Sequence, residues 1–464
     1  MREQAIANAE GIFDSGEFRE TLARRVAVPT ESQNPARTAE LRRYLDVELR
    51  AAFEQMGFDC RIMTHPLARG PFLFAQRIED PSHATVLGYG HGDVVRGLDP
   101  EWRDGLSPWT LTSRDGNWYG RGIADNKGQH SVNLQAFRSV LEERGALGFN
   151  AKYLIETGEE VASPGLRELC EENRELFDAH VLIASDGPRL SAERPTLFLG
   201  ARGCLNFDLS ICAREGGHHS GNWGGLISNP GIQLAHAIAS IVSDTGQIRI
   251  PDWVPPQLPD SVRRALAGCE VSGGVDGPVV EDAWGEPGLT PAERVFGWSS
   301  FEVLAFKTGN PETPVNAIPP RAWARCQLRF VVGVDADEVL PALRRHLDRH
   351  GFPMVDVRLA EGTLFRPSRT DPDDPWVTWA AASIARTSGE TPAVLPNLGG
   401  SLPNDIFTDV LGLRTLWVPH SYPGCSQHAP NEHLPSRLLR GALRIMTGLY
   451  WDLGEGDLPL PSRS

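Results

Sequence analysis

Helix-like and strand-like hydrophobic spacings alternate along the first part of the chain. In residues 38–56, large apolar side chains recur at helical spacing, and Gly57 follows as a helix stop. Strands that are apolar on both faces and separated by helices indicate an α/β sheet that is covered on both sides. The other segments predicted here are strands at 84–90, 151–156 and 180–187 and helices at about 129–144 and after Ser163.

The pattern changes near residue 203. Residues 204–212 (CLNFDLSIC) alternate between apolar and polar side chains, as a half-exposed strand does. Four strands with two helices on one side are typical of a small α+β sandwich. The predicted elements are strands at about 204–212, 300–306, 322–332 and 354–359, helices at about 229–243 and 337–348, and a Pro-rich and Gly-rich insertion at about 246–295.

From about residue 366 the α/β pattern resumes, with a helix-like WVTWAAASIA and a strand-like LRTLWVP. The simplest organisation is one α/β domain with a mixed sheet covered by helices, interrupted by an inserted two-layer α+β domain. We predict that residues 1–202 and 366–464 form the first domain and that residues 203–365 form the second.

The net charge of −15 disfavours nucleic-acid backbones and anionic membranes as partners, because both would be repelled. No stretch approaches the roughly 20 apolar residues of a membrane span, and the N-terminal segment has no signal-peptide core. Seven scattered cysteines without CxxC spacing suit reduced thiols. We therefore expect a cytoplasmic protein with neither nucleic-acid nor membrane partners.

Ionisable residues follow the predicted strands of the α/β domain. In open α/β sheets, loops at the carboxyl ends of strands converge on the ligand crevice. His91 alone would fit a polar turn equally well, so the whole set carries the prediction. Its members are His91 and Asp93 after the strand at 84–90, Asp125 before a helix, Glu159 and Glu160 after 151–156, Asp186 at the end of 180–187, and His428 after 413–418.

Carboxylates gathered at one sheet edge repel one another unless a cation lies between them. Two imidazoles with carboxylates, and no thiolate, suit zinc, manganese or cobalt better than an iron–sulfur cluster or a four-cysteine zinc site. Asp93 fits the role of accepting the second ring N–H of His91, which would fix the tautomer of the imidazole. Two alternatives without metal binding stay open: Glu159 and Glu160 could form a charged helix start, and Asp186 could be a turn residue.

Eight motifs stand in the order seen in the M20 metallopeptidases, which include carnosinase-like dipeptidases, carboxypeptidases and amino-acid deacylases. They are HGDVV, YGRGIADNKG, TGEEVASPGL, SDGP, HHSGNWGG, NAIPP, GGSLP and QHAPNEH. The resemblance covers nearly the whole chain and implies a catalytic α/β domain with an inserted lid and dimerisation domain. It also implies a homodimer.

The resemblance implies two divalent ions, most simply Zn²⁺, bridged by Asp125 and a water or hydroxide. One ion would be held by His91 and Asp186, and the other by Glu160 and His428. Glu159 would act as the general base, which is consistent with an unligated carboxylate beside a metal-activated water.

In the inserted domain, the resemblance assigns His219 to oxyanion stabilisation in a neighbouring subunit's active site. His218 beside it is read as a neighbour without a chemical role. Asn316 matches a polar lid position and Arg329 a lid arginine that binds the substrate carboxylate, although either could be a solvated strand residue. Gly400 and Ser401 match a loop that would hold the same carboxylate through N–H and hydroxyl donors.

One departure from the family pattern removes two charges from the pocket rim and favours an acyl or aryl amide of an amino acid over a standard dipeptide with a free amino group. Carnosinase-like members usually carry an Arg-Glu pair before GGS, where this chain has Asn397 and Leu398. We expect a hydrolase that cleaves an amide bond in a small carboxylate-bearing substrate, as a dipeptidase or carboxypeptidase. The alternatives are an N-acyl-amino-acid deacylase, a deaminase, or a metal-binding relative without turnover, and the intact Glu159 disfavours the last.

Overall fold

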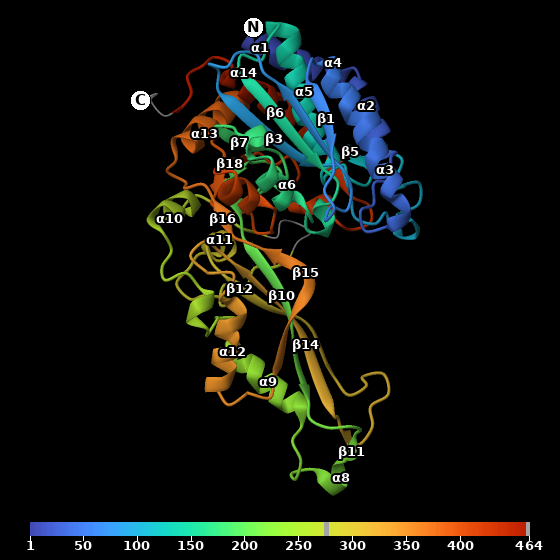
Figure 1. Ribbon diagram of the computed structural model, residues 1–464, viewed down its shortest axis with the longest axis vertical. Coiled ribbons are helices and arrows are strands. Elements are labelled where there is room, and N and C mark those ends of the chain that lie inside the picture. Colours follow the sequence, from blue (N-terminus) through green and yellow to red (C-terminus); the bar gives the residue numbers. More distant parts are fainter. Residues whose placement is uncertain (273–277, 461–464) are drawn as a thin grey trace.

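The computed structural model describes residues 1–272 and 278–460 and is built around two main sheets with their helices, with three short sheets beside them (Figure 1). The larger sheet has eight strands in the order β1-β2-β6-β3-β7-β18-β8-β17. Its strands β6, β3, β7 and β18 run parallel to one another, whereas β1 and β2 pair antiparallel at one edge. The strand bounds are β1 Asp59–Met63, β2 Phe72–Arg77, β3 Thr85–His91, β6 Asn150–Glu156, β7 Val181–Ala184, β8 Thr196–Phe198, β17 Ala393–Leu395 and β18 Arg414–Trp417.

Helices cover both faces of this sheet, as the uninterrupted apolar strands predict. In β7, Val181 and Ile183 enter one apolar core, while Leu182 and Ala184 enter the other. The first core lies beneath α1 (Arg2–Asp14), α2 (Glu17–Val26), α5 (Lys127–Arg144), α13 (Pro375–Ser388) and α14 (Ser436–Leu453). The second lies beneath α6 (Leu166–Glu172), α7 (Arg174–Phe177) and a π-helix at Ile406–Val410.

The helix predicted at 38–56 is continuous but changes type along its length. It runs as α3 (Thr38–Arg43), a π-helical segment (Tyr44–Arg50) and α4 (Ala51–Gln55), and it ends before Gly57, whose φ is +77°. Short pieces complete this part: β4 (Thr112–Arg114), β5 (Asn117–Tyr119), β9 (Gly200–Ala201), β16 (Ser368–Arg369) and β19 (His433–Pro435).

The smaller sheet is antiparallel, in the order β12-β14-β10-β15. Its apolar side packs against α9 and α12, so the four strands and two helices predicted from the sequence are confirmed. Their bounds are β10 Gly203–Cys212, β12 Ser300–Thr308, β14 Arg321–Phe330, β15 Asp356–Phe365, α9 Pro230–Ile241 and α12 Val339–Arg349. Beyond them, at the end far from the large sheet, lie β11 (His218–His219), α8 (Ser220–Trp223) and β13 (Ala317–Ile318) (Figure 1).

The Pro-rich insertion contains two helices that the sequence pattern does not predict, α10 (Asp260–Leu266) and α11 (Pro291–Phe296). Val262, Leu266 and Phe296 join the second core of the large sheet, and α10 packs against β17. Among the described helices, none is long and apolar enough to cross a membrane.

Candidate metal centre

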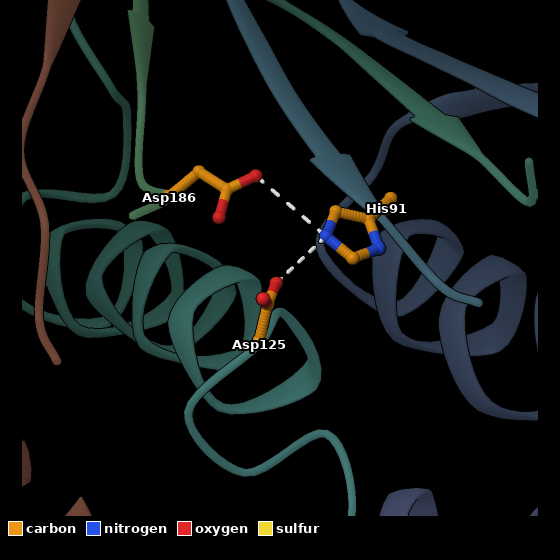
Figure 2. Close-up of side chains that lie close together, drawn as sticks. All are labelled: His91, Asp125 and Asp186. Atoms are coloured by element: carbon orange, nitrogen blue, oxygen red, sulfur yellow. Dashed lines mark hydrogen bonds and ion pairs between the residues drawn. The ribbon is translucent and has the colours of Figure 1, made fainter. Parts of the chain in front are cut away.

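The ionisable residues predicted from the strand ends come together at one edge of the large sheet. His91 is the last residue of β3, Asp186 follows β7, and Asp125 lies just before α5 (Figure 2). Glu159 and Glu160 open a short 3₁₀ helix after β6. His428 lies in the loop after β18, so four parallel neighbouring strands deliver this set.

Two clusters of candidate ligands share Asp125. His91, Asp125 and Asp186 form the first, and Asp125, Glu160 and His428 form the second, with ligand atoms within 4.8 Å of one another in each. His91 Nε2 lies 3.0 Å from Asp125 Oδ1 and 3.6 Å from Asp186 Oδ2. His428 Nε2 lies 3.1 Å from both Asp125 Oδ2 and Glu160 Oε2. Asp125 therefore presents one oxygen to each cluster, as a bridging ligand does.

The donor set fits divalent cations. Glu160 Oε1 and Asp186 Oδ2 are buried without a hydrogen-bond partner. An unsatisfied buried carboxylate oxygen is costly, and coordination to a cation removes that cost. Imidazole nitrogen and carboxylate oxygen are ligands of zinc, manganese and cobalt, and neither cluster includes a thiolate.

The pKa values of the site show that its buried carboxylates lack enough nearby positive charge. Burial raises the pKa of Glu160 to about 7 and that of Asp186 to about 6, and nearby Asp125 adds to both effects. Burial also raises the pKa of Glu159 well above its usual value, against the opposing influence of His91. Hydrogen bonds to Asp125 and Glu160 raise the pKa of His428 to about 11. Divalent cations would supply the missing charge.

Asp93 links His91 to the two glutamates. His91 Nδ1 lies 3.0 Å from the Asp93 carbonyl oxygen and 3.4 Å from its carboxylate Oδ1. The Asp93 carboxylate accepts hydrogen bonds from the backbone N–H groups of Glu159 and Glu160, each at 3.2 Å. The carbonyl is thus the nearer partner of the ring, and the carboxylate holds the turn that carries both glutamates.

Sequence reasoning missed Glu432, which organises the loop before Asp125. Its carboxylate accepts hydrogen bonds from the backbone N–H groups of Gly122, Ala124 and Asp125, and it pairs with Arg121 Nη1 at 2.8 Å. Both charged side chains are only 1% exposed. The QHAPNEH motif contains Glu432, but the sequence alone does not indicate which backbone groups its carboxylate binds.

The predicted substrate-binding residues fall into two groups. His219 is the last residue of β11, which lies at the far tip of the small sheet (Figure 1). Asn316 lies beside it, since Ser220 N donates to the Asn316 carbonyl at 2.9 Å. His219 is exposed, and its Nδ1 accepts from Gly221 N at 3.1 Å. Arg329 on β14 instead approaches the glycine loop, residues 398–401, where its Nη1 donates to Ser401 Oγ at 3.2 Å. Within one chain, the tip is thus separate from the metal centre.

A mixed α/β sheet that gathers two histidines and unsatisfied carboxylates at its strand ends is the arrangement of a metal-dependent enzyme. The model of peptidase family M20/M25/M40 matches residues 87–452, and the chain belongs to this family. The predicted family, and with it an enzyme, are confirmed.

Individual relatives agree with this assignment. A cysteinylglycine-S-conjugate dipeptidase from Corynebacterium striatum is 30% identical over 366 residues, which are 76% of this chain and 77% of the relative. A Beta-Ala-His dipeptidase from Mus musculus is 31% identical over 386 residues, 78% of this chain and 76% of the relative. The crystal structure of human carnosine dipeptidase 1 matches with a TM-score of 0.78 at 22% identity, covering 98% of this chain and 99% of that one, which supports the predicted fold.

Proposed function

We propose that this protein is a dinuclear metal-dependent dipeptidase acting on small substrates with a free carboxylate. The observation that carries the proposal is that Asp125 presents one carboxylate oxygen to each of the two ligand clusters. Glu159 lies beside these clusters and belongs to neither. The two relatives described above are dipeptidases, for cysteinylglycine S-conjugates and for Beta-Ala-His. Carboxypeptidase activity would use the same site on a longer substrate.

We assign His91, Asp125 and Asp186 to one ion and Asp125, Glu160 and His428 to the other. Zinc suits these nitrogen and oxygen donors, and manganese or cobalt would also fit. When bound, the two ions supply Lewis acidity to water and to the scissile carbonyl.

Glu159 is the proposed proton carrier. Its carboxylate lies 4.0 Å from His91 Nε2, and Asp93 holds its backbone N–H. Burial raises its pKa well above the usual carboxyl value. A group of this kind can take a proton from the attacking water and return it to the leaving amine.

Completion of the site requires a second copy of the chain. We propose that the exposed His219 at the tip enters the partner's metal centre and stabilises the oxyanion, with Asn316 beside it. A preorganised donor of this kind is worth about 3 kcal/mol in transition-state stabilisation. We propose that residues 1–202 and 366–464 form the catalytic domain and that residues 203–365 form the inserted domain, which supplies the tip.

We also propose a cytoplasmic location, which the seven free cysteines support.

An N-acyl-amino-acid deacylase is the second candidate, because the rim before the glycine loop carries no charge. Asn397 is buried, and its amide donates to the Phe296 carbonyl at 2.8 Å, while Leu398 is apolar. Neither side chain offers a carboxylate to a free substrate amine. Nothing in these two side chains therefore favours a free amine over a neutral acyl group.

The test is a substrate panel with metal reconstitution. Chelated protein should lose activity and regain it with zinc, manganese or cobalt. Cysteinylglycine and β-alanyl-histidine, compared with N-acyl amino acids of matched leaving group, separate the two candidates. Activity indifferent to chelation would refute the metal centre, and hydrolysis of the acyl compounds alone would favour the deacylase.

A further inference from the structure

A buried arginine lies where the chain passes from the large sheet to the small one. Arg202 stands between β9 and β10 and is 7% exposed. Its guanidinium donates twice to the Gly399 carbonyl, from Nε at 2.9 Å and from Nη2 at 2.6 Å. Nη1 reaches Ser300 Oγ on β12 at 3.4 Å. One side chain thus ties the glycine loop to the edge strand of the small sheet.

The main chain of Arg202 holds the same loop. Its N–H donates to the Leu398 carbonyl at 3.4 Å, and its carbonyl accepts from Ser401 Oγ at 2.8 Å. Because the Ser401 proton is directed to Arg202, the hydroxyl oxygen is free to accept from Arg329 Nη1. Within the described part of the chain, the remaining guanidinium nitrogens of Arg329 and the backbone N–H groups of Gly400 and Ser401 have no hydrogen-bond acceptor, which leaves them as donors for a substrate.

The two arginines lack a local counterion. Among the side chains that the structure describes, no carboxylate forms an ion pair with Arg202 or Arg329, and Glu302 acts on Arg202 through charge alone, without a hydrogen bond. Burial, reinforced by the nearby charge of Arg329, lowers the pKa of Arg202 to about 9. Two guanidinium groups around one loop without a carboxylate form a setting in which an added anion is favoured.

We propose that Arg202 is a positioning residue that fixes the glycine loop beside Arg329 and thereby makes a free carboxylate on the substrate a requirement for binding. This proposal rests on the proposed hydrolysis of carboxylate-bearing amides and explains how the enzyme would select substrates that carry a free carboxylate. Arg202 does not touch the substrate: its hydrogen bonds hold the loop whose N–H groups do. Lysine keeps the charge but cannot make the paired bonds to Gly399.

The experiment compares alanyl-alanine with its C-terminal amide in metal-loaded wild-type, Arg202→Lys and Arg144→Lys proteins. Arg144 is the matched control, since its guanidinium also makes two hydrogen bonds to backbone carbonyl oxygens, here those of Leu147 and Trp451, but at the opposite end of α5 from Asp125. We expect Arg202→Lys to reduce the carboxylate-over-amide ratio of kcat/KM about tenfold, mainly through KM, with metal content unchanged. Arg144→Lys should leave that ratio at the wild-type value.

A ratio that stays at the wild-type value in Arg202→Lys would overturn the proposal, whether or not thermal stability falls. If Arg202→Lys does not fold, Ser401→Ala decides: it removes the other side-chain hydrogen bond between the loop and Arg202, from Ser401 Oγ to the Arg202 carbonyl, and should lower the ratio. An unchanged ratio in Ser401→Ala would refute the proposal that Arg202 fixes the loop. If the wild-type protein hydrolyses neither peptide, the proposed function fails separately. Calorimetric binding of alanyl-alanine to Glu159→Gln protein, with and without Arg202→Lys, then tests the loop: binding weakened about tenfold supports the proposal, and equal binding overturns it.

Discussion

At the scale of single residues, neighbours in sequence divide into different tasks according to what their side chains face. Glu160 presents Oε2 to His428, whereas the adjacent Glu159 makes no ion-pair contact shorter than 4.0 Å. Asp93 holds both backbones, so the difference arises from side-chain direction alone. The sequence could predict that both carboxylates reach the site, because they follow a parallel strand, while the resemblance supplied the division of roles.

Replacing Glu159 by glutamine should separate metal binding from turnover. Glutamine is nearly isosteric but cannot accept a proton, so we expect both ions to bind while kcat falls by several orders of magnitude. Elemental analysis of the metal-loaded protein and steady-state kinetics on the same sample measure the two effects. Undiminished kcat would remove Glu159 from its role as the base.

Replacing Glu432 by glutamine should weaken the metal centre without touching a ligand. Arg121 would be left buried without its partner, at a cost of about 3 kcal/mol in unfolding free energy. The loop before Asp125 would also lose an ionised acceptor, and we expect at least about tenfold weaker metal binding.

Chemical denaturation and metal titration measure the two effects of the Glu432 substitution. Glu193→Gln is the control, because its ion pair with Arg437 is exposed and is worth about 0–1 kcal/mol. Equal metal affinity in the Glu432 variant and wild type would refute the positioning role.

At the scale of elements, the start of α5 shows how closely a helix and a catalytic loop are fitted. Gly128 lies in the first turn of α5, and a Cβ there would lie 1.9 Å from the Ile123 carbonyl oxygen. The loop before Asp125 therefore packs directly on the helix backbone. The helix was predictable from its spacing and from Gly145 at its end, but this contact was not, because it depends on how the loop folds back.

Gly128→Ala should displace the loop that carries Asp125. The added methyl group meets backbone and not a mobile side chain, so we expect a destabilisation of about 2 kcal/mol and reduced metal occupancy. Gly441→Ala in α14 is the matched control: its Cβ meets nothing within 4 Å, and alanine should stabilise that helix by about 1 kcal/mol. Thermal unfolding and metal content of both variants measure this, and similar behaviour of the two would contradict the packing argument.

At the scale of the whole molecule, long-range packing is the part that the sequence could not provide. Hydrophobic periodicity predicted both sheets, because the spacing of apolar residues within a strand or helix shows which of its faces is buried. It did not predict that α10 and α11 pack on the large sheet, since Val262 and Phe296 stand in a Pro-rich and Gly-rich stretch without clear periodicity. Nor does periodicity indicate that a tip bearing His219 lies away from its own metal centre.

Because the tip lies away from the metal centre of its own chain, we predict that activity depends on residues from both subunits of a dimer. Glu159→Gln and His219→Ala should each be nearly inactive alone, the first for want of the proton carrier and the second for want of the oxyanion donor. In a mixed dimer, one site would combine an intact Glu159 with a partner's intact His219. We therefore expect a mixture, after subunit exchange, to regain up to about a quarter of wild-type activity, because half of the dimers would be hybrids and each hybrid would hold one complete site.

Activity of the mixture is measured against each variant alone at the same total concentration. Mixing Glu159→Gln with Glu160→Gln is the control, since both changes lie in the large-sheet part and no hybrid site then holds both glutamates. Recovery in the first mixture and not in the second would establish a site shared across the dimer. Exchange demonstrated by differently tagged subunits, but without recovery in the first mixture, would place His219 outside the partner's catalysis.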